Sequence, residues 1–116
     1  MEKILEEILY PVGISNRYRG YPYFLMAIHL ASEDLSRLAN IQKEIYVPIA
    51  FHYHVSHINV ERDIRTIRDV IVRNGGAEFL KQISGGSYRY TGTLYPTELI
   101  ELFTKYYLRA LCRTVE

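Results

Sequence analysis

Apolar residues recur along this chain at intervals of three and four, the spacing of amphipathic helices. The first predicted helix ends at YPVG (10–13), and the turn-rich loop GISNRYRGY (13–21) follows it. One long helix is then predicted over 23–38, with an apolar stripe made of Phe24, Ala27, Ile28, Ala31, Leu35 and Leu38. The first third of the chain is therefore predicted to be helical.

The segment 40–56 is compatible with two helical arrangements. Asn40 is a suitable N-cap for a helix beginning at Ile41, but Pro48 lies too far inside such a helix to fit comfortably. Either that helix kinks at Pro48, or a new short helix starts with Pro48 in its first turn. The polar sequence HVSHIN (54–59) then interrupts the pattern, and Ser56 can cap the next helix.

The next helix is predicted over 57–74, where Val60, Ile64, Ile67 and Ile71 form one apolar side. Gly75 and Gly76 provide the left-handed conformation that ends many helices. A short helix over 77–83, a loop or two-stranded hairpin over 84–96 and a last helix opened by Pro96 complete the chain. No linker or repeat interrupts it, so 1–116 is predicted to be one all-α domain of about six helices.

Residues 49–64 have the spacing of two helices joined by a tight turn. A helix-turn-helix needs a small residue where the helices cross and an apolar residue just after the turn. It also needs two apolar residues one turn apart on the second helix. Ala50, Val55, Val60 and Ile64 meet these requirements in order, so the sequence predicts an embedded helix-turn-helix.

The side of the 57–74 helix opposite its apolar stripe is predicted to face outward, and it comprises Ile58, Asn59, Arg62, Arg65, Thr66, Asp69 and Arg73. In a major groove, arginine can bridge guanine O6 and N7, and asparagine can bridge adenine N6 and N7. Threonine can contact a methyl group or a phosphate. The alternative interpretation is a solvated helix surface with alternating charges, which looks similar over so few residues.

Composition and charge do little to decide between a DNA-contacting surface and a solvated one. The 116 residues are 48% hydrophobic, enough for one core, and the formal charge of +1 argues against a strongly basic nucleic-acid binder. No apolar run approaches the ~20 residues that span a bilayer, and MEKILEEILY does not have the pattern of a signal peptide. Cys112 has no second cysteine to pair with. A cytoplasmic protein is expected.

Three segments carry a family resemblance: VGISNRYRGYPYFLMAI (12–28), IAFHYHVSHINVERDIR (49–65) and YPTELIELF (95–103). With almost no gaps, 12–110 resembles the C-terminal DNA-binding effector domain of the sporulation stage zero A response regulator of endospore-forming Firmicutes. The resemblance implies a helical domain that contacts DNA with the 57–74 helix, often as two domains in tandem. It also implies that Glu61, Arg62 and Arg65 approach bases or backbone.

The chain departs from the family at informative positions. Asn59 and Thr66 replace an arginine and a histidine of the family, which implies an altered base preference. Phe51 and His52 replace paired lysines, which implies weaker DNA binding, with the salt slope lower by about one unit per lost phosphate contact. The family's receiver domain is missing from the sequence, so either an excised effector domain or a natural short relative is expected.

Other functions have weaker support in the sequence. His52, His54 and His57 lie close together, but no fourth metal ligand is evident nearby. A polar surface, with a phosphate contact when they are protonated, suits them better. GGSYRYTG lacks the lysine and the setting of a phosphate-binding loop, so no catalytic residue is predicted. The 11 tyrosines favour one real alternative, a protein-interaction module that pairs with a full-length regulator.

The predicted site follows from the resemblance and from the outward side of the 57–74 helix. Base contacts are predicted for Asn59, Glu61, Arg62 and Thr66. Backbone contacts are predicted for Arg17, Arg19, Lys43, His52, Ser56, His57 and Arg65. Expected partners are double-stranded DNA, a second copy or a full-length regulator, and RNA polymerase, with no membrane, cofactor or metal.

Overall fold

The structure is a computed structural model that describes residues 2–115, and within this range it is helical without any strand. The predicted all-α fold class is confirmed. The α-helices are α1 (Glu2–Leu9), α2 (Gly20–Glu33), α3 (Val47–Tyr53), α4 (His57–Arg73), α5 (Gly76–Ile83) and α6 (Pro96–Val115). Shorter helical segments are the 3-10 turns η1 (Tyr10–Val12) and η2 (Leu35–Asn40) and the π-helical turn η3 (Gln42–Tyr46).

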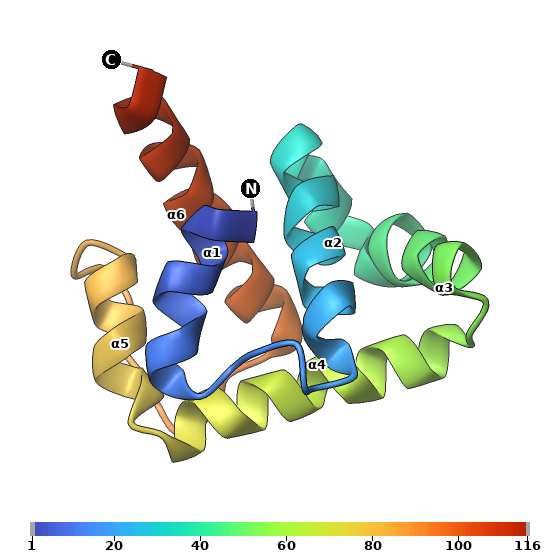
Figure 1. Cartoon of the computed structure of the whole chain (residues 1–116), viewed down its shortest axis with the longest axis horizontal. Helices are drawn as coiled ribbons and strands as arrows, with labels where there is room; N and C mark the ends of the chain where they lie inside the picture. Colours follow the sequence, from blue (N-terminus) through green and yellow to red (C-terminus); the bar gives the residue numbers. More distant parts are fainter. Residues whose placement is uncertain (1, 116) are drawn as a thin grey trace.

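Helix α4 runs along one side of the domain, with α3 at its N-terminal end and α5 at its C-terminal end (Figure 1). Helices α2 and α6 pack against each other and against α4. The core lies between these three helices, where the Phe24 ring meets the Phe103 ring edge-on with centroids 5.2 Å apart. Phe79 of α5 adds a third ring, 5.8 Å from Phe103. Buried apolar residues of these three helices therefore belong to one core.

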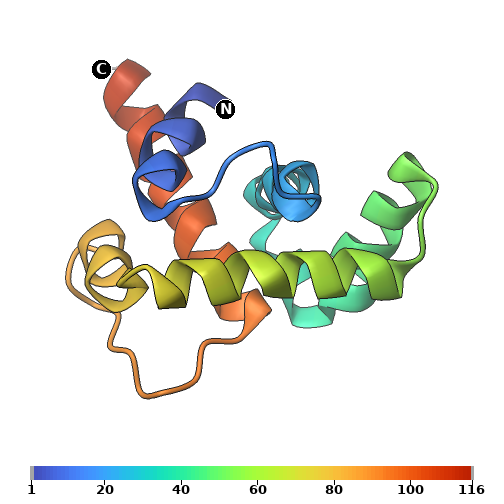
Figure 2. The same ribbon diagram turned by 60° about the horizontal axis from the view of Figure 1, so that its bottom comes forward.

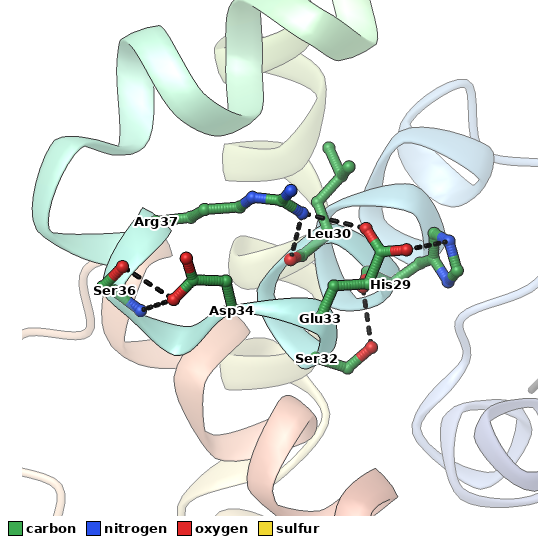
Figure 3. A network of polar contacts seen from close by, with 7 residues as sticks. All are labelled: His29, Leu30, Ser32, Glu33, Asp34, Ser36 and Arg37. Carbon is green, nitrogen blue, oxygen red and sulfur yellow. Dashed lines mark hydrogen bonds and ion pairs between the residues drawn. The ribbon is translucent and has the colours of Figure 1, made fainter.

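The predicted long helix over 23–38 is wrong at its C-terminal end, because α2 stops at Glu33. Asp34 is extended and accepts hydrogen bonds from the backbone N–H and the hydroxyl of Ser36, so it caps η2 instead of continuing α2 (Figure 3). The Arg37 guanidinium donates to the Leu30 carbonyl at 2.7 Å and to Glu33 at 2.9 Å, which satisfies a free carbonyl at the end of α2. Leu35, predicted as core, is consequently exposed.

The prediction of Asn40 as an N-cap is also wrong. Asn40 is the last residue of η2, and the backbone passes from there through Ile41 into the π-helical turn η3 without a capping side chain. Pro48 lies in the first turn of α3, as one of the two predicted arrangements required. Pro48 has no N–H to donate to the Glu44 carbonyl, and a proline ring crowds the carbonyl four residues before it. Just before Pro48, the Val47 N–H donates to the Gln42 carbonyl, five residues back, which is the hydrogen bond of a π-helical turn.

Helix α4 agrees with its prediction at both ends. The Ser56 hydroxyl accepts a hydrogen bond from the Asn59 N–H at 3.1 Å, and Gly75 adopts a left-handed conformation after the helix. Between α3 and α4, His54 is left-handed with φ 58°, and the Val55 N–H donates to the Ala50 carbonyl at 3.0 Å. These bonds fix a connection of three residues between the helices.

The segment 84–95 forms a loop rather than the alternative hairpin. The Ser84 hydroxyl accepts from the Tyr88 N–H at 2.9 Å, and the Arg109 guanidinium of α6 donates to the Ile83 carbonyl just before the loop. Arg68 of α4 also reaches the loop, 3.4 Å from the Leu94 carbonyl. In residues 2–115 there is no helix with both the length and the apolar character to span a membrane.

Candidate nucleic-acid interface

Helix α4 has two chemically distinct sides. Val60, Ile64, Ile67 and Ile71 are 0% exposed and pack into the core. On the opposite side, Arg62, Arg65, Thr66, Asp69 and Arg73 are exposed. Figure 2 shows α4 along its whole length in front of the other helices, from the turn after α3 to the start of α5. This side of α4 is available to a partner over several turns.

Arg62 lies at the middle of the exposed side. Its side chain is 55% exposed, and its only described ion pair is a loose one, with Nε 3.4 Å from Oδ1 of the neighbouring Asp63. Asp63 itself is nearly buried, with a side chain 12% exposed. The Arg62 guanidinium can therefore extend away from the protein without leaving a tight partner behind.

Asn59 and Thr66 flank Arg62 along the helix. Asn59 is half-buried in the first turn of α4, where its backbone N–H is held by Ser56. The Thr66 hydroxyl donates to the Arg62 carbonyl at 3.2 Å, so its proton is used inside the helix. Thr66 therefore keeps only its oxygen lone pairs and its methyl group for a partner, which restricts it to donors and apolar groups.

Glu61 and Arg65 bind each other. The Arg65 guanidinium donates to the Glu61 carboxylate one helical turn earlier, and both side chains remain partly exposed. Tyr46 of η3 lies beside this pair: burial, with a contribution from the Glu61 carboxylate, raises the pKa of Tyr46 to about 12, while Arg65 opposes the rise. Any phosphate or base that engages one of the two side chains must compete with the other.

A third arginine of α4 has a carboxylate partner on the same helix. Arg68 donates to Oδ1 of Asp69, with Nε at 3.0 Å and Nη2 at 2.8 Å. With the pairs Arg62–Asp63 and Arg65–Glu61, this makes three neighbouring arginine–carboxylate pairs along α4. Unlike the other two arginines, Arg68 is directed to the 84–95 loop, which gives it a structural role.

The residues predicted to contact the DNA backbone come from three places. Lys43 and His52 are exposed on η3 and α3, just before α4, and the His52 ring packs edge-on against Tyr53 at 4.8 Å. Ser56 and His57 lie at the N-terminus of α4, where the helix dipole favours anions. The Ser56 oxygen accepts the capping bond, so the hydroxyl proton remains to donate.

Arg17 and Arg19 form the third group, in the loop before α2. Both are exposed, and the Arg17 guanidinium lies 5.7 Å from the centre of the Tyr18 ring. Gly20, the residue after Arg19, packs against the α4 backbone at Asp63. Through this contact the loop is positioned beside the middle of α4, although the two segments are far apart in the sequence.

Two exposed apolar side chains near this surface were given no role in the prediction. Ile58 in the first turn of α4 is 65% exposed, and Phe51 on α3 is 84% exposed. Helical periodicity places Ile58 on the outward side of α4. An apolar residue at an outward position is the feature of the sequence that could have marked Ile58 as a functional residue. For Phe51 the available signal was its place at a position where the family has a lysine.

Other chemistry has little support in the described residues. Within residues 2–115, no three histidine, cysteine, aspartate or glutamate side chains are grouped so that they could hold a metal ion. A groove of about 710 Å³ lies between α1, α2 and the end of α3, and its lining includes Tyr10, Tyr21, Tyr53, Pro22, Leu25 and Met26. Its tyrosine-rich wall resembles a protein-binding surface more than a catalytic pocket.

Comparison with known protein families agrees with this surface. Residues 5–106 match the family described as "sporulation initiation factor Spo0A C terminal", and the match runs from within α1 to the middle of α6. It takes up most of the 116 residues. The predicted resemblance is confirmed: the chain belongs to the Spo0A C-terminal family, whose members are DNA-binding effector domains of transcription regulation in sporulation and not enzymes.

Proposed function

We propose that this chain is a sequence-specific DNA-binding transcription regulator in which α3 and α4 form a helix-turn-helix. The observation that supports this most is the two-sided character of α4, buried along one side and exposing arginine and threonine along the other, with Asn59 half-buried in its first turn. The connection of three residues after α3, with its left-handed His54, suits the sharp angle of such a motif. The N-terminal half of α4 would enter the major groove.

In this proposal the base contacts come from one stretch of α4. Arg62 contacts a base, ideally guanine through O6 and N7, because its guanidinium is exposed and only loosely paired. Glu61 accepts a hydrogen bond from a cytosine amino group, while Asn59 and Thr66 modify which bases are preferred. The hydrogen bond from the Thr66 hydroxyl to the Arg62 carbonyl fixes the orientation of the Thr66 side chain one helical turn after Arg62.

The backbone contacts surround that stretch. Arg65 and Lys43 bind phosphates on the side of η3, with Ser56, His57 and His52 near the N-terminus of α4, and the Arg17 and Arg19 loop beside its middle. Positive groups on several sides of one helix would fix its position in the groove. The chain would act as one domain in the bacterial cytoplasm, with a second copy, a full-length regulator and RNA polymerase as partners.

The alternative function is protein interaction with little or no DNA binding. The groove lined by Tyr10, Tyr21 and Tyr53 favours it, as does the almost balanced charge. A module of this kind would bind a full-length regulator and compete with it. The two functions differ in a simple property, since only a DNA-binding protein enriches particular sequences from random DNA.

The test is selection from a random pool of double-stranded DNA, followed by gel shifts at two salt concentrations. We expect one enriched sequence, bound roughly 10³-fold or more tightly than a scrambled one, with affinity falling as salt rises. Equal binding to enriched and scrambled DNA would contradict sequence specificity. Absence of any shift at low salt would favour the protein-interaction module.

A further inference from the structure

Ile58 is an unusual side chain for a solvent-exposed position. At 65% exposure it is the most exposed of the large aliphatic residues within 3–113, above Val47 at 43% and Leu35 at 41%. Its neighbours on α4 are polar or charged on the outward side. An isoleucine in this place costs solvation free energy and gains no packing within the domain.

The side chain is also held rigidly. Ile58 is the second residue of α4, inside a first turn closed by the Ser56 cap and by the bond from the Val60 N–H to the Ser56 carbonyl at 3.2 Å. A β-branched side chain in a helix has one strongly preferred rotamer. The protein therefore presents a fixed apolar group at the N-terminal end of α4.

Ile58 precedes Arg62 by one helical turn, so both project from the same side of α4. If α4 enters the major groove as proposed above, Ile58 enters with it and faces base edges. Those edges carry donors, acceptors and one apolar group, the C5 methyl of thymine. We infer that Ile58 contacts a thymine methyl group and makes this chain prefer thymine at one position next to the base pair bound by Arg62.

The inference rests on the proposed DNA-binding function, and the experiment separates the two. A sequence selected from random DNA is synthesised with each thymine replaced in turn by deoxyuridine, which removes only the methyl group. For the wild-type protein we expect a loss of affinity of about fourfold at one position, the effect of burying one methyl group. The other uridine substitutions should have little effect.

The variant Ile58→Ala should bind the thymine site more weakly and no longer distinguish thymine from uridine at that position. Ile58→Val keeps the β-branch and should retain part of the preference, and circular dichroism melting checks that both variants fold. Leu35→Ala, which removes an exposed aliphatic side chain from η2, is the matched control and should behave as wild type.

Four results would overturn the inference. A selected site without thymine beside the Arg62 position, or equal binding of uridine and thymine at every position, would do so while leaving the DNA-binding function intact. Preserved discrimination in Ile58→Ala would assign the preference to another residue. Failure to select any sequence would remove the proposed function itself, and the inference with it.

Discussion

Gly20 at the start of α2 lies in direct contact with the backbone of α4 at Asp63. A Cβ atom on Gly20 would lie 2.3 Å from the Asp63 carbonyl oxygen and 2.7 Å from its carbonyl carbon. Atoms cannot approach that closely, so only glycine permits the two helices to cross here. The crossing also positions the Arg17 and Arg19 loop beside the middle of α4.

Gly20→Ala should therefore destabilise the domain by about 1–3 kcal/mol, because the helices must separate to admit one methyl group. Chemical denaturation measures the change. Asn16→Ala, an exposed change in the same loop, is the control and should leave stability within about 0.5 kcal/mol of wild type. A Gly20→Ala protein as stable as wild type would show that the crossing is looser than described.

Arg62→Ala should lower affinity for the selected DNA by about 1–3 kcal/mol and relax the preference at one base pair. Chemical denaturation is measured beside it, because Arg62 is the only described partner of the nearly buried Asp63 carboxylate. Arg73→Ala, also exposed but at the other end of α4, should retain the preference. If Arg62→Ala, like Arg73→Ala, loses as much affinity for scrambled DNA as for selected DNA, then Arg62 binds phosphate and not a base.

Replacing Phe51 and His52 together by lysine should strengthen DNA binding and steepen its salt dependence. Both positions are exposed on α3, so the ammonium groups can reach phosphates without disturbing the core. The slope of log K against log salt should become more negative by roughly 0.9 for each new contact. Leu35→Lys is the control. It adds a charge on η2, which follows the C-terminal end of α2, whereas α2 contacts α4 at its N-terminal end, so the slope should change less.

Tyr46 should make the stability of the domain depend on alkaline pH. Its pKa is raised from an ordinary value of 10.0 to about 12, so the folded state holds the proton more tightly than the unfolded state. The contribution of the protonated Tyr46 hydroxyl to the free energy of unfolding is therefore fully present below pH 10 and is lost as pH rises towards 12. Urea unfolding at pH 9 and pH 11 should show a smaller decrease for Tyr46→Phe than for wild type. An equal decrease in both proteins would mean that Tyr46 titrates normally.

Local patterns in the sequence were sufficient for α4. Its apolar residues repeat with helical spacing, and both of its boundaries are marked by residues that act on their immediate neighbours, Ser56 and Gly75. The same is true of Pro96 at the start of α6. Elements whose ends depend on such short-range chemistry could be predicted because the decisive contacts lie within a few residues.

The end of α2 and the path into α3 could not be predicted in the same way. Leu35 and Leu38 continue the apolar period of α2, but the capping bonds of Asp34 and the Arg37 contact to Leu30 stabilise a different backbone. The aspartate two residues before Ser36 was a cap signal that the apolar period masked. Before Pro48 the chain stays helical but forms a π-helical turn, and no simple sequence pattern predicts such a turn.

For the candidate site, periodicity identified the outward side of α4 but not what its residues bind in the free protein. The Glu61–Arg65 pair follows from their spacing of four, whereas the contact of Gly20 with Asp63 joins residues over 40 positions apart and needs the fold. The base preference of the surface depends on the DNA partner, so neither sequence nor fold defines it completely.

The arginine–carboxylate pairs along α4 have a consequence for how the protein would search a genome. Arg62, Arg65 and Arg68 each have an acidic neighbour on the same helix, and beyond the Debye length of about 8 Å the helix is close to neutral. The electrostatic attraction between α4 and distant DNA would therefore be weak. For the same reason the protein would slide only briefly along DNA of unrelated sequence. Such a protein would reach its target mainly by repeated collision and would stay only where the bases match.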